Sequence, residues 1–266
     1  MRVDQLLVER GLAASRSQAQ RLIAAGVQWR NPPSALPASA LASADWRQVS
    51  KNKDEVPDNA ELVLLDDSES RYVSRGGLKL AGALRSSGLS VQGLRCLDVG
   101  QSTGGFTECL LQNGAAQVVG IDVGHGQVHP RVRADERVIC IEGVNARELM
   151  PDDDRIPDAQ DGFDVLVGDV SFISLSLVLP GVVPFLKSGG HLLMLVKPQF
   201  ELQPENIGKH GLVKDPAMYP VIEKRIRTAC TELGLRVTGW YDSAIEGGDG
   251  SREFFVQAVK DDIHQL

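Results

Sequence analysis

The sequence has few cysteines and aromatic residues and lacks a long apolar run. Four cysteines are spread over 266 residues with no CxxC pair and no nearby histidine cluster, which argues against a zinc site or a disulfide framework. We expect them to be reduced, buried thiols, as is usual in the cytoplasm. The longest uncharged run, Val170 to Leu186, is shorter than the roughly 20 residues of a membrane helix. With no apolar signal segment at the start, we predict a cytoplasmic protein that uses neither a metal nor a membrane.

An overall excess of positive charge is also missing, since the formal net charge is −7. The charge is nevertheless unevenly placed along the chain. Residues 1–53 carry eight basic and three acidic side chains, whereas residues 76–266 carry 18 basic and 25 acidic ones. A basic N-terminal part on an acidic body indicates where a polyanion would bind.

The most informative segment is residues 95–122, RCLDVGQSTGGFTECLLQNGAAQVVGID. A short apolar strand runs into a glycine-containing turn, Gly100 to Gly105. A helix follows from about Phe106, and a second apolar strand ends on Asp122. This pattern is typical of one half of an open α/β nucleotide-binding sheet. The turn has neither the G-x-G-x-x-G spacing of a dinucleotide site nor the Gly-Lys-Ser/Thr of a P-loop.

The acidic residues of this segment favour S-adenosylmethionine as the ligand. Asp122, at the tip of the second strand, can accept hydrogen bonds from ribose hydroxyls, and Asp98 can face the ammonium of an amino acid. S-adenosylmethionine has ribose, ammonium and sulfonium groups but no phosphate. The adenine edge would lie near Asn145, after the third strand. The predicted cofactor residues are Asp98, Gly100, Ser102, Gly104, Asp122 and Asn145. The alternative is a strand-turn-helix corner that binds no ligand.

The N-terminal residues 1–66 are predicted to form a small α+β domain. Apolar residues at helical spacing indicate two helices within its first 26 residues. The stretch 31–44, NPPSALPASALASA, reads as an irregular surface excursion, and two short strands follow it. Residues 67–74 are expected to be a linker.

Residues 75–266 are predicted to form the second domain. A helix over residues 75–87 precedes strands that alternate with helices, which predicts a doubly wound, mainly parallel, Rossmann-like α/β sheet. The last two strands, near residues 235–240 and 254–259, are expected to close the sheet as an antiparallel hairpin.

The segment RVDQLLVERGLAASRSQAQRLIAAG, residues 2–26, resembles the S4 RNA-binding domain. The resemblance implies that basic side chains of the helical pair contact the RNA backbone. Exposed arginines neutralise phosphates and release counterions, which agrees with that role. The implied RNA-binding residues are Arg2, Arg16 and Arg21, with Lys51 and Lys53 as weaker candidates. The alternative is a solvated basic face without a partner.

Residues 75–260 resemble the FtsJ-type ribose 2'-O-methyltransferases, and the whole chain resembles the TlyA or haemolysin-A-like rRNA methyltransferases. The matching segments, in order, are VSRGGLKL, STGGFTECLL, DVGHGQV, GDVSFISL, LVKPQFE and REFF. FtsJ-type enzymes use a Lys-Asp-Lys-Glu tetrad, which falls here on Lys79, Asp169, Lys197 and Glu253. Two positions depart from the family: Gln101 stands where alanine is usual, and Ser251 where asparagine is common.

The resemblance implies an S-adenosylmethionine-dependent enzyme that methylates ribose 2'-hydroxyls of rRNA in ribosomal subunits. We expect Lys197 to activate the hydroxyl and Lys79 to orient the ribose. Asp169 would hold Lys197, and Glu253 would anchor Lys79. One alternative is a structural ion-pair cluster in a non-catalytic RNA-binding or assembly protein. Another is a haemolysin, as one family name suggests, although no amphipathic or membrane-length segment supports it.

Overall fold

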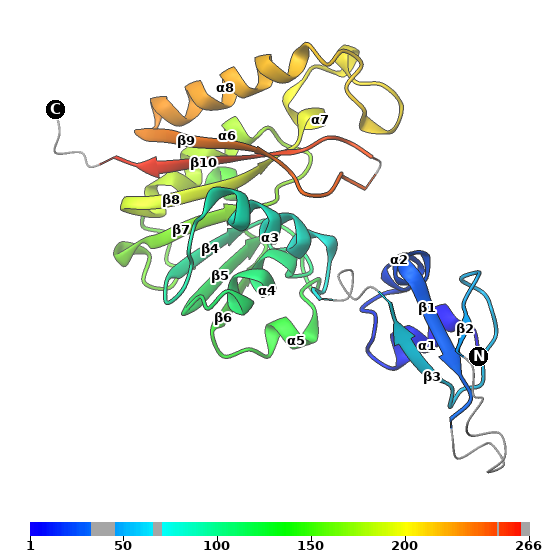
Figure 1. Ribbon diagram of the computed structural model, residues 1–266. Coiled ribbons are helices and arrows are strands. Elements are labelled where there is room, and N and C mark those ends of the chain that lie inside the picture. The colour runs from blue at the N-terminus through cyan, green and yellow to red at the C-terminus, as the bar shows by residue number, and fades with distance from the viewer. Residues whose placement is uncertain (33–45, 66–70, 249, 262–266) are drawn as a thin grey trace. The chain divides into compact units, whose positions relative to one another are not determined.

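The computed structural model describes residues 1–32, 46–65, 71–248 and 250–261. The chain divides into two compact units, Met1–Arg75 and Gly76–Leu266, which are described separately (Figure 1). Most of the stretch expected as a surface excursion, and residues 67–70 of the expected linker, lie outside the described residues.

The first unit packs two helices against a small antiparallel sheet. Its elements are α1 (Val3–Glu9), α2 (Arg16–Gly26), β1 (Val27–Arg30), β2 (Arg47–Gln48) and β3 (Glu61–Leu64). The strand order is β2-β1-β3, and both pairings are antiparallel. Apolar residues at helical spacing put one face of each helix into a core that includes Val3, Leu6, Leu7, Leu22 and Val27.

The second unit is built on a seven-stranded sheet. Its strands are β4 (Arg95–Val99), β5 (Gln117–Asp122), β6 (Val138–Glu142), β7 (Phe163–Gly168), β8 (Leu186–Val196), β9 (Leu235–Asp242) and β10 (Phe254–Lys260). They lie in the order β6-β5-β4-β7-β8-β10-β9. All pairings are parallel except those of β10, which runs antiparallel to both β8 and β9. The predicted fold, a mainly parallel Rossmann-like sheet, is confirmed.

Helices cover both faces of this sheet, as the apolar composition of its central strands requires. In Figure 1, α3 and α4 lie in front of the sheet, whereas α6 and α8 pack together against the other face. The helices are α3 (Arg75–Ser87), α4 (Gly105–Gln112), α5 (Pro130–Arg133), α6 (Leu175–Val182), α7 (Pro198–Glu201) and α8 (Met218–Glu232). Short 3₁₀ turns occur at Ala146–Glu148, Ala159–Asp161, Val183–Phe185, Pro204–Asn206 and Lys209–Gly211.

The strand order reverses at β4, which pairs with β5 on one side and β7 on the other. Loops leaving the carboxyl ends of these strands therefore diverge to opposite faces and open a crevice, where ligands bind in open α/β sheets. Across the described parts of the chain, no helix is long and apolar enough to cross a membrane.

Candidate active site

A pocket of about 340 Å³ opens at this crevice, within the size range of small-molecule sites. It is lined by the loops that follow β4, β5, β6 and β7. No Lys or Arg is among these lining residues, so the pocket offers no cationic side chain to a phosphate. Its lining includes Gly100, Ser102, Ile121, Asp122, Val144, Asn145, Asp169, Phe172 and Val178.

The glycine turn is fixed by close backbone contacts at the pocket. Gly100 has φ +80°, and a Cβ there would lie 2.7 Å from the carbonyl oxygen of Asp169. Only glycine allows this approach between the loops after β4 and β7. Ser102, also in the left-handed region at φ 49°, donates its backbone N–H to Asp122 Oδ2 at 2.7 Å. Asp122 thus ties the turn to the end of β5.

Two polar residues present oxygen and nitrogen atoms at the pocket wall. Asp122 Oδ1 accepts the backbone N–H of Gly124 at 2.7 Å, and each carboxylate oxygen retains a second lone pair for a ligand hydroxyl. Asn145 begins the turn Ala146–Glu148, where its Oδ1 accepts the N–H of Arg147 at 3.1 Å. These bonds hold both side chains in place without exhausting their hydrogen-bonding capacity.

The remaining predicted cofactor residues, Asp98 and Gly104, are not among the pocket-lining residues. Gly104 is the left-handed residue that starts α4, and a Cβ there would lie 2.9 Å from Val132. Asp98 is fully buried in β4, with Oδ2 accepting a 2.7 Å hydrogen bond from Thr107. Its Oδ1 has no hydrogen-bond partner among the described residues. Burial, with the nearby charge of Asp169 in support, raises the pKa of Asp98 to about 7.

The four predicted catalytic side chains form two ion pairs. Lys79 on α3 lies 2.5 Å from Glu253, and these side chains are only 10% and 2% exposed. Lys197, directly after β8, pairs with Asp169, directly after β7. Lys197 also donates to Ser171 Oγ at 2.8 Å.

The sheet register brings the two ion pairs to the same edge. β10 runs antiparallel to β8, with Phe254 opposite Val196. Glu253 and Lys197 are the residues next to that pair, at the carboxyl end of β8. The fold therefore gathers residues that are separated by up to 174 positions in sequence.

Two further residues at this edge were not found from the sequence. Phe172 lines the pocket, is 90% exposed and has a left-handed backbone at φ 65°. Its ring centroid lies 5.3 Å from that of Phe200. A lone phenylalanine in a strand-end loop gives no sequence signal of exposure, because apolar residues there usually enter the core.

Glu201 was the other residue missed. It is 3% exposed, and its carboxylate accepts the backbone N–H of Leu175 at 2.7 Å and the hydroxyl of Ser174 at 2.6 Å. Burial raises its pKa. Glu201 ends α7, which follows Lys197, and its partners begin α6, which follows Phe172. It therefore braces the two loops that form the edge.

The predicted RNA-binding residues lie on the first unit in different surroundings. Asp4 is fully buried and pairs with Arg2 at 2.8 Å and with Arg16 at 3.2 Å. The arginine side chains remain 38% and 54% exposed. Arg21 donates to Ser17 Oγ, while Lys51 and Lys53 are exposed near Asp54. Asp4 thus holds two arginines whose side chains remain partly exposed.

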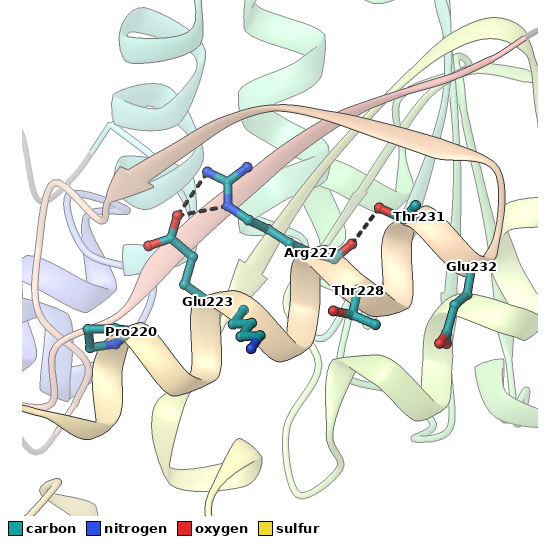
Figure 2. A pocket seen from close by; sticks show the side chains of 7 residues that line it. Pro220, Glu223, Arg227, Thr228, Thr231 and Glu232 are labelled. Carbon is teal, nitrogen blue, oxygen red and sulfur yellow. Dashed lines mark hydrogen bonds and ion pairs between the residues drawn. The ribbon is translucent and has the colours of Figure 1, made fainter.

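A second hollow lies along the outer flank of α8, away from the crevice (Figure 2). All of its lining residues belong to that helix. Glu223 and Arg227 form an i, i+4 ion pair at 2.8 Å, and Thr231 donates to the Arg227 carbonyl. With side chains from one solvated helix alone, this hollow has no converging groups for catalysis.

Comparison with known proteins decides the family. The FtsJ-like methyltransferase family matches residues 72–260, and the S4 domain matches residues 1–26. The chain belongs to the FtsJ-like methyltransferases. The predicted family and the predicted class of enzyme, a methyltransferase, are confirmed.

Relatives within this family extend the match to almost the whole chain. The Mycobacterium tuberculosis 16S/23S rRNA (cytidine-2'-O)-methyltransferase TlyA is 42% identical over 257 residues, 96% of this chain and 88% of that protein. The Bacillus subtilis YqxC protein, named as an rRNA methyltransferase, is 40% identical over 96% of this chain and 84% of its own. A solved structure from Streptococcus thermophilus, described as a haemolysin, is 37% identical, covers 98% of this chain and 89% of that one, and has a TM-score of 0.71.

Proposed function

We propose that this protein transfers the methyl group of S-adenosylmethionine to a ribose 2'-hydroxyl of ribosomal RNA, within ribosomal subunits in the cytoplasm. Residues 1–66 would bind RNA as the S4-like domain, residues 67–74 would link, and residues 75–266 would carry the methyltransferase site. The observation that carries the proposal is the position of the Lys197–Asp169 pair, whose carboxylate also lines the pocket. The name of the mycobacterial relative supports cytidine as the nucleotide.

The pocket supports S-adenosylmethionine as its ligand. Apolar side chains such as Ile121, Val144 and Val178 suit an adenine ring, and Asn145 suits its polar edge. Asp122 would accept hydrogen bonds from ribose hydroxyls. The carboxylate of Asp169 at the pocket wall suits the sulfonium, and the charge of Asp98, which is buried outside the lining residues with an unpartnered Oδ1, would favour the ammonium. The lack of lining cations argues for this phosphate-free ligand over a dinucleotide.

The two ion pairs support different roles for Lys197 and Lys79 in the reaction. S-adenosylmethionine supplies the electrophilic methyl carbon and leaves as S-adenosylhomocysteine. Lys197 would hold the attacking 2'-oxygen and stabilise the negative charge that develops on it while the hydroxyl proton passes to solvent water. The 2'-oxygen would bond to the methyl carbon as the carbon–sulfur bond breaks. Asp169 and Ser171 fix the Lys197 ammonium, and Glu253 holds Lys79 where it can orient the ribose. In-line positioning would supply much of the rate.

Features of both units support an RNA substrate. Phe172 offers an exposed aromatic face beside the pocket on which an unpaired base can stack. Arg2, Arg16 and Arg21, with Lys51 and Lys53 as weaker contributors, would neutralise backbone phosphates. Because Asp4 orients two of these arginines, we expect their RNA contacts to be more directional than those of the lysines.

The direct test is methyl transfer to small and large ribosomal subunits that lack the modification. Labelled S-adenosylmethionine would be supplied, and the product mapped by the resistance of 2'-O-methylated positions to alkaline cleavage. We expect label at a defined cytidine ribose. Tight subunit binding with no transferred label would instead support the non-catalytic assembly protein.

A further inference from the structure

A chain of three buried side chains runs from the glycine turn to Asp98. Gln101 Nε2 donates to Thr107 Oγ1 at 2.9 Å, and Thr107 Oγ1 donates to Asp98 Oδ2 at 2.7 Å. Gln101 and Thr107 are 3% and 0% exposed. A hydroxyl has a single proton, so the donation from Gln101 commits the proton of Thr107 to the carboxylate.

The site of the Gln101 side chain is specifically shaped for it. Its amide lies over Gly120 in β5, where a Cβ would come within 2.0 Å of the amide carbon. Any other residue at position 120 would displace Gln101. The Gln101 side chain is not among the pocket-lining residues, and its amide donates to Thr107.

We infer that Gln101 is a positioning residue that acts through Thr107 to keep the Asp98 carboxylate ionised and aimed at the ammonium of S-adenosylmethionine. This inference rests on the proposed function. Gln101 itself would not touch the cofactor. Its contribution is to make Thr107 a full-time donor, and a hydrogen bond donated to a carboxylate favours the charged form.

The surroundings of Asp98 explain why such help is needed. Burial is the main factor that raises its pKa to about 7, and Asp169 after β7 and Asp122 at the end of β5 raise it further. Burial raises the pKa of the thiols of Cys96 on β4 and Cys140 on β6, and the charge of Asp98 adds to this effect. A hydrogen bond with Gln101 acts in the opposite direction on Cys140. Within the part of the chain that the structure describes, hydrogen bonds from the Thr107 hydroxyl and amide oppose these effects and lower the pKa of Asp98. Because the pKa of Asp98 lies near neutral pH, a small change in the hydrogen bonds from Thr107 changes the ionised fraction of Asp98.

The test is the Gln101→Met variant, which keeps the length of the side chain but removes its donor. Its affinity for S-adenosylmethionine would be measured by calorimetry from pH 6 to pH 9. We expect the wild type to lose affinity below about pH 7, as Asp98 becomes protonated. The variant should bind about threefold to tenfold more weakly at pH 7, with the midpoint moved to higher pH. Affinity for 5'-methylthioadenosine, which lacks the amino acid, should be unchanged.

Two controls separate positioning from a general loss of structure. Gln92→Met makes the same replacement at an exposed glutamine whose amide lies over Gly114, outside the pocket. It should bind like the wild type. In a Thr107→Val background, Gln101→Met should have no further effect, whereas in Thr107→Ser its effect should return.

Three results would overturn the inference alone: wild-type affinity of Gln101→Met at every pH, an equal loss for 5'-methylthioadenosine, or an undiminished effect in Thr107→Val. A wild type that does not bind S-adenosylmethionine would overturn the proposed function, and this inference with it.

Discussion

Each end of the paired strands β7 and β8 carries a Lys–Asp ion pair, and the two ion pairs differ in how far they are exposed. At the amino ends, Lys187 lies 2.7 Å from Asp164, with side chains 42% and 29% exposed. At the carboxyl ends, Lys197 pairs with Asp169, with side chains 11% and 23% exposed. The second pair adjoins the crevice pocket through Asp169, at the end of the sheet where the strand order reverses. The comparison teaches that position at the switch point, rather than the ion pair itself, makes a candidate active site.

The largest difference between the two ion pairs is expected in the rate of methyl transfer when Lys197 or Lys187 is removed. Lys197→Ala should lower single-turnover methyl transfer by about 10²- to 10⁴-fold, because the attacking oxygen loses its partner. Its affinity for S-adenosylmethionine should stay near that of the wild type. Lys187→Ala should leave transfer unchanged. Equal losses in the two variants, measured on the same RNA, would break the comparison.

The next largest difference is expected in the free energy of unfolding when an ion pair at each end of the strands is broken. Glu253→Gln leaves Lys79 buried without its counter-ion and should lower the free energy of unfolding by about 3–5 kcal/mol. Asp164→Asn breaks a surface pair and should cost less than about 1 kcal/mol. Urea titrations measure both. If Glu253→Gln were no more costly than Asp164→Asn, the buried pair would not be a stabilising element.

The contributions of Asp98 and Asp164 to the free energy of unfolding should depend on pH with opposite signs. The raised pKa of Asp98 means that the folded state binds its proton more tightly, so stability falls as pH rises from about 4 to about 7. Asp98→Asn should remove this loss and stabilise the protein at pH 8, by up to about 4 kcal/mol at roughly 1.4 kcal/mol per pKa unit. The same variant should bind S-adenosylmethionine poorly.

Asp164 provides the contrast. Burial raises its pKa, but hydrogen bonds from Lys187 and the Arg95 amide outweigh that effect and lower it. Its contribution is present above about pH 4 and is lost as pH falls through the lowered pKa. Asp164→Asn should therefore destabilise at pH 7 and converge with the wild type in acid. Unfolding free energies measured from pH 2 to pH 8 that moved in parallel for the two variants would contradict this.

The smallest effect concerns the exposed ring of Phe172 at the carboxyl ends of the strands. Phe172→Ala should weaken RNA binding by about 1–3 kcal/mol, since one stacked base loses its platform. Phe172→Tyr should retain binding, and Phe172→Leu should fall between them. Binding of S-adenosylmethionine is the control and should not change. A Leu variant equal to Tyr would mean that apolar area, and not an aromatic face, is what RNA uses.

Much of this edge could be predicted from local sequence. The helical spacing of apolar residues predicts a helix over residues 75–87, and α3 forms over the same span. Asp122 was expected at a strand tip and ends β5. The carboxyl-end positions of Asp169 and Lys197 also follow from the apolar strands that precede them. The grouping of the two ion pairs came from family resemblance, since no local pattern links Lys79 to Glu253.

The sequence by itself determined the alternation of strands and helices, the glycine turn and the residues at the strand ends, because these depend on neighbours within a few positions. Only the tertiary structure decided that Glu201 braces two loops, that Phe172 is exposed, and that Gln101 lies over Gly120 and supports Asp98. Such contacts join different strands and loops of the sheet. They depend on side-chain packing and burial, which chain periodicity does not encode.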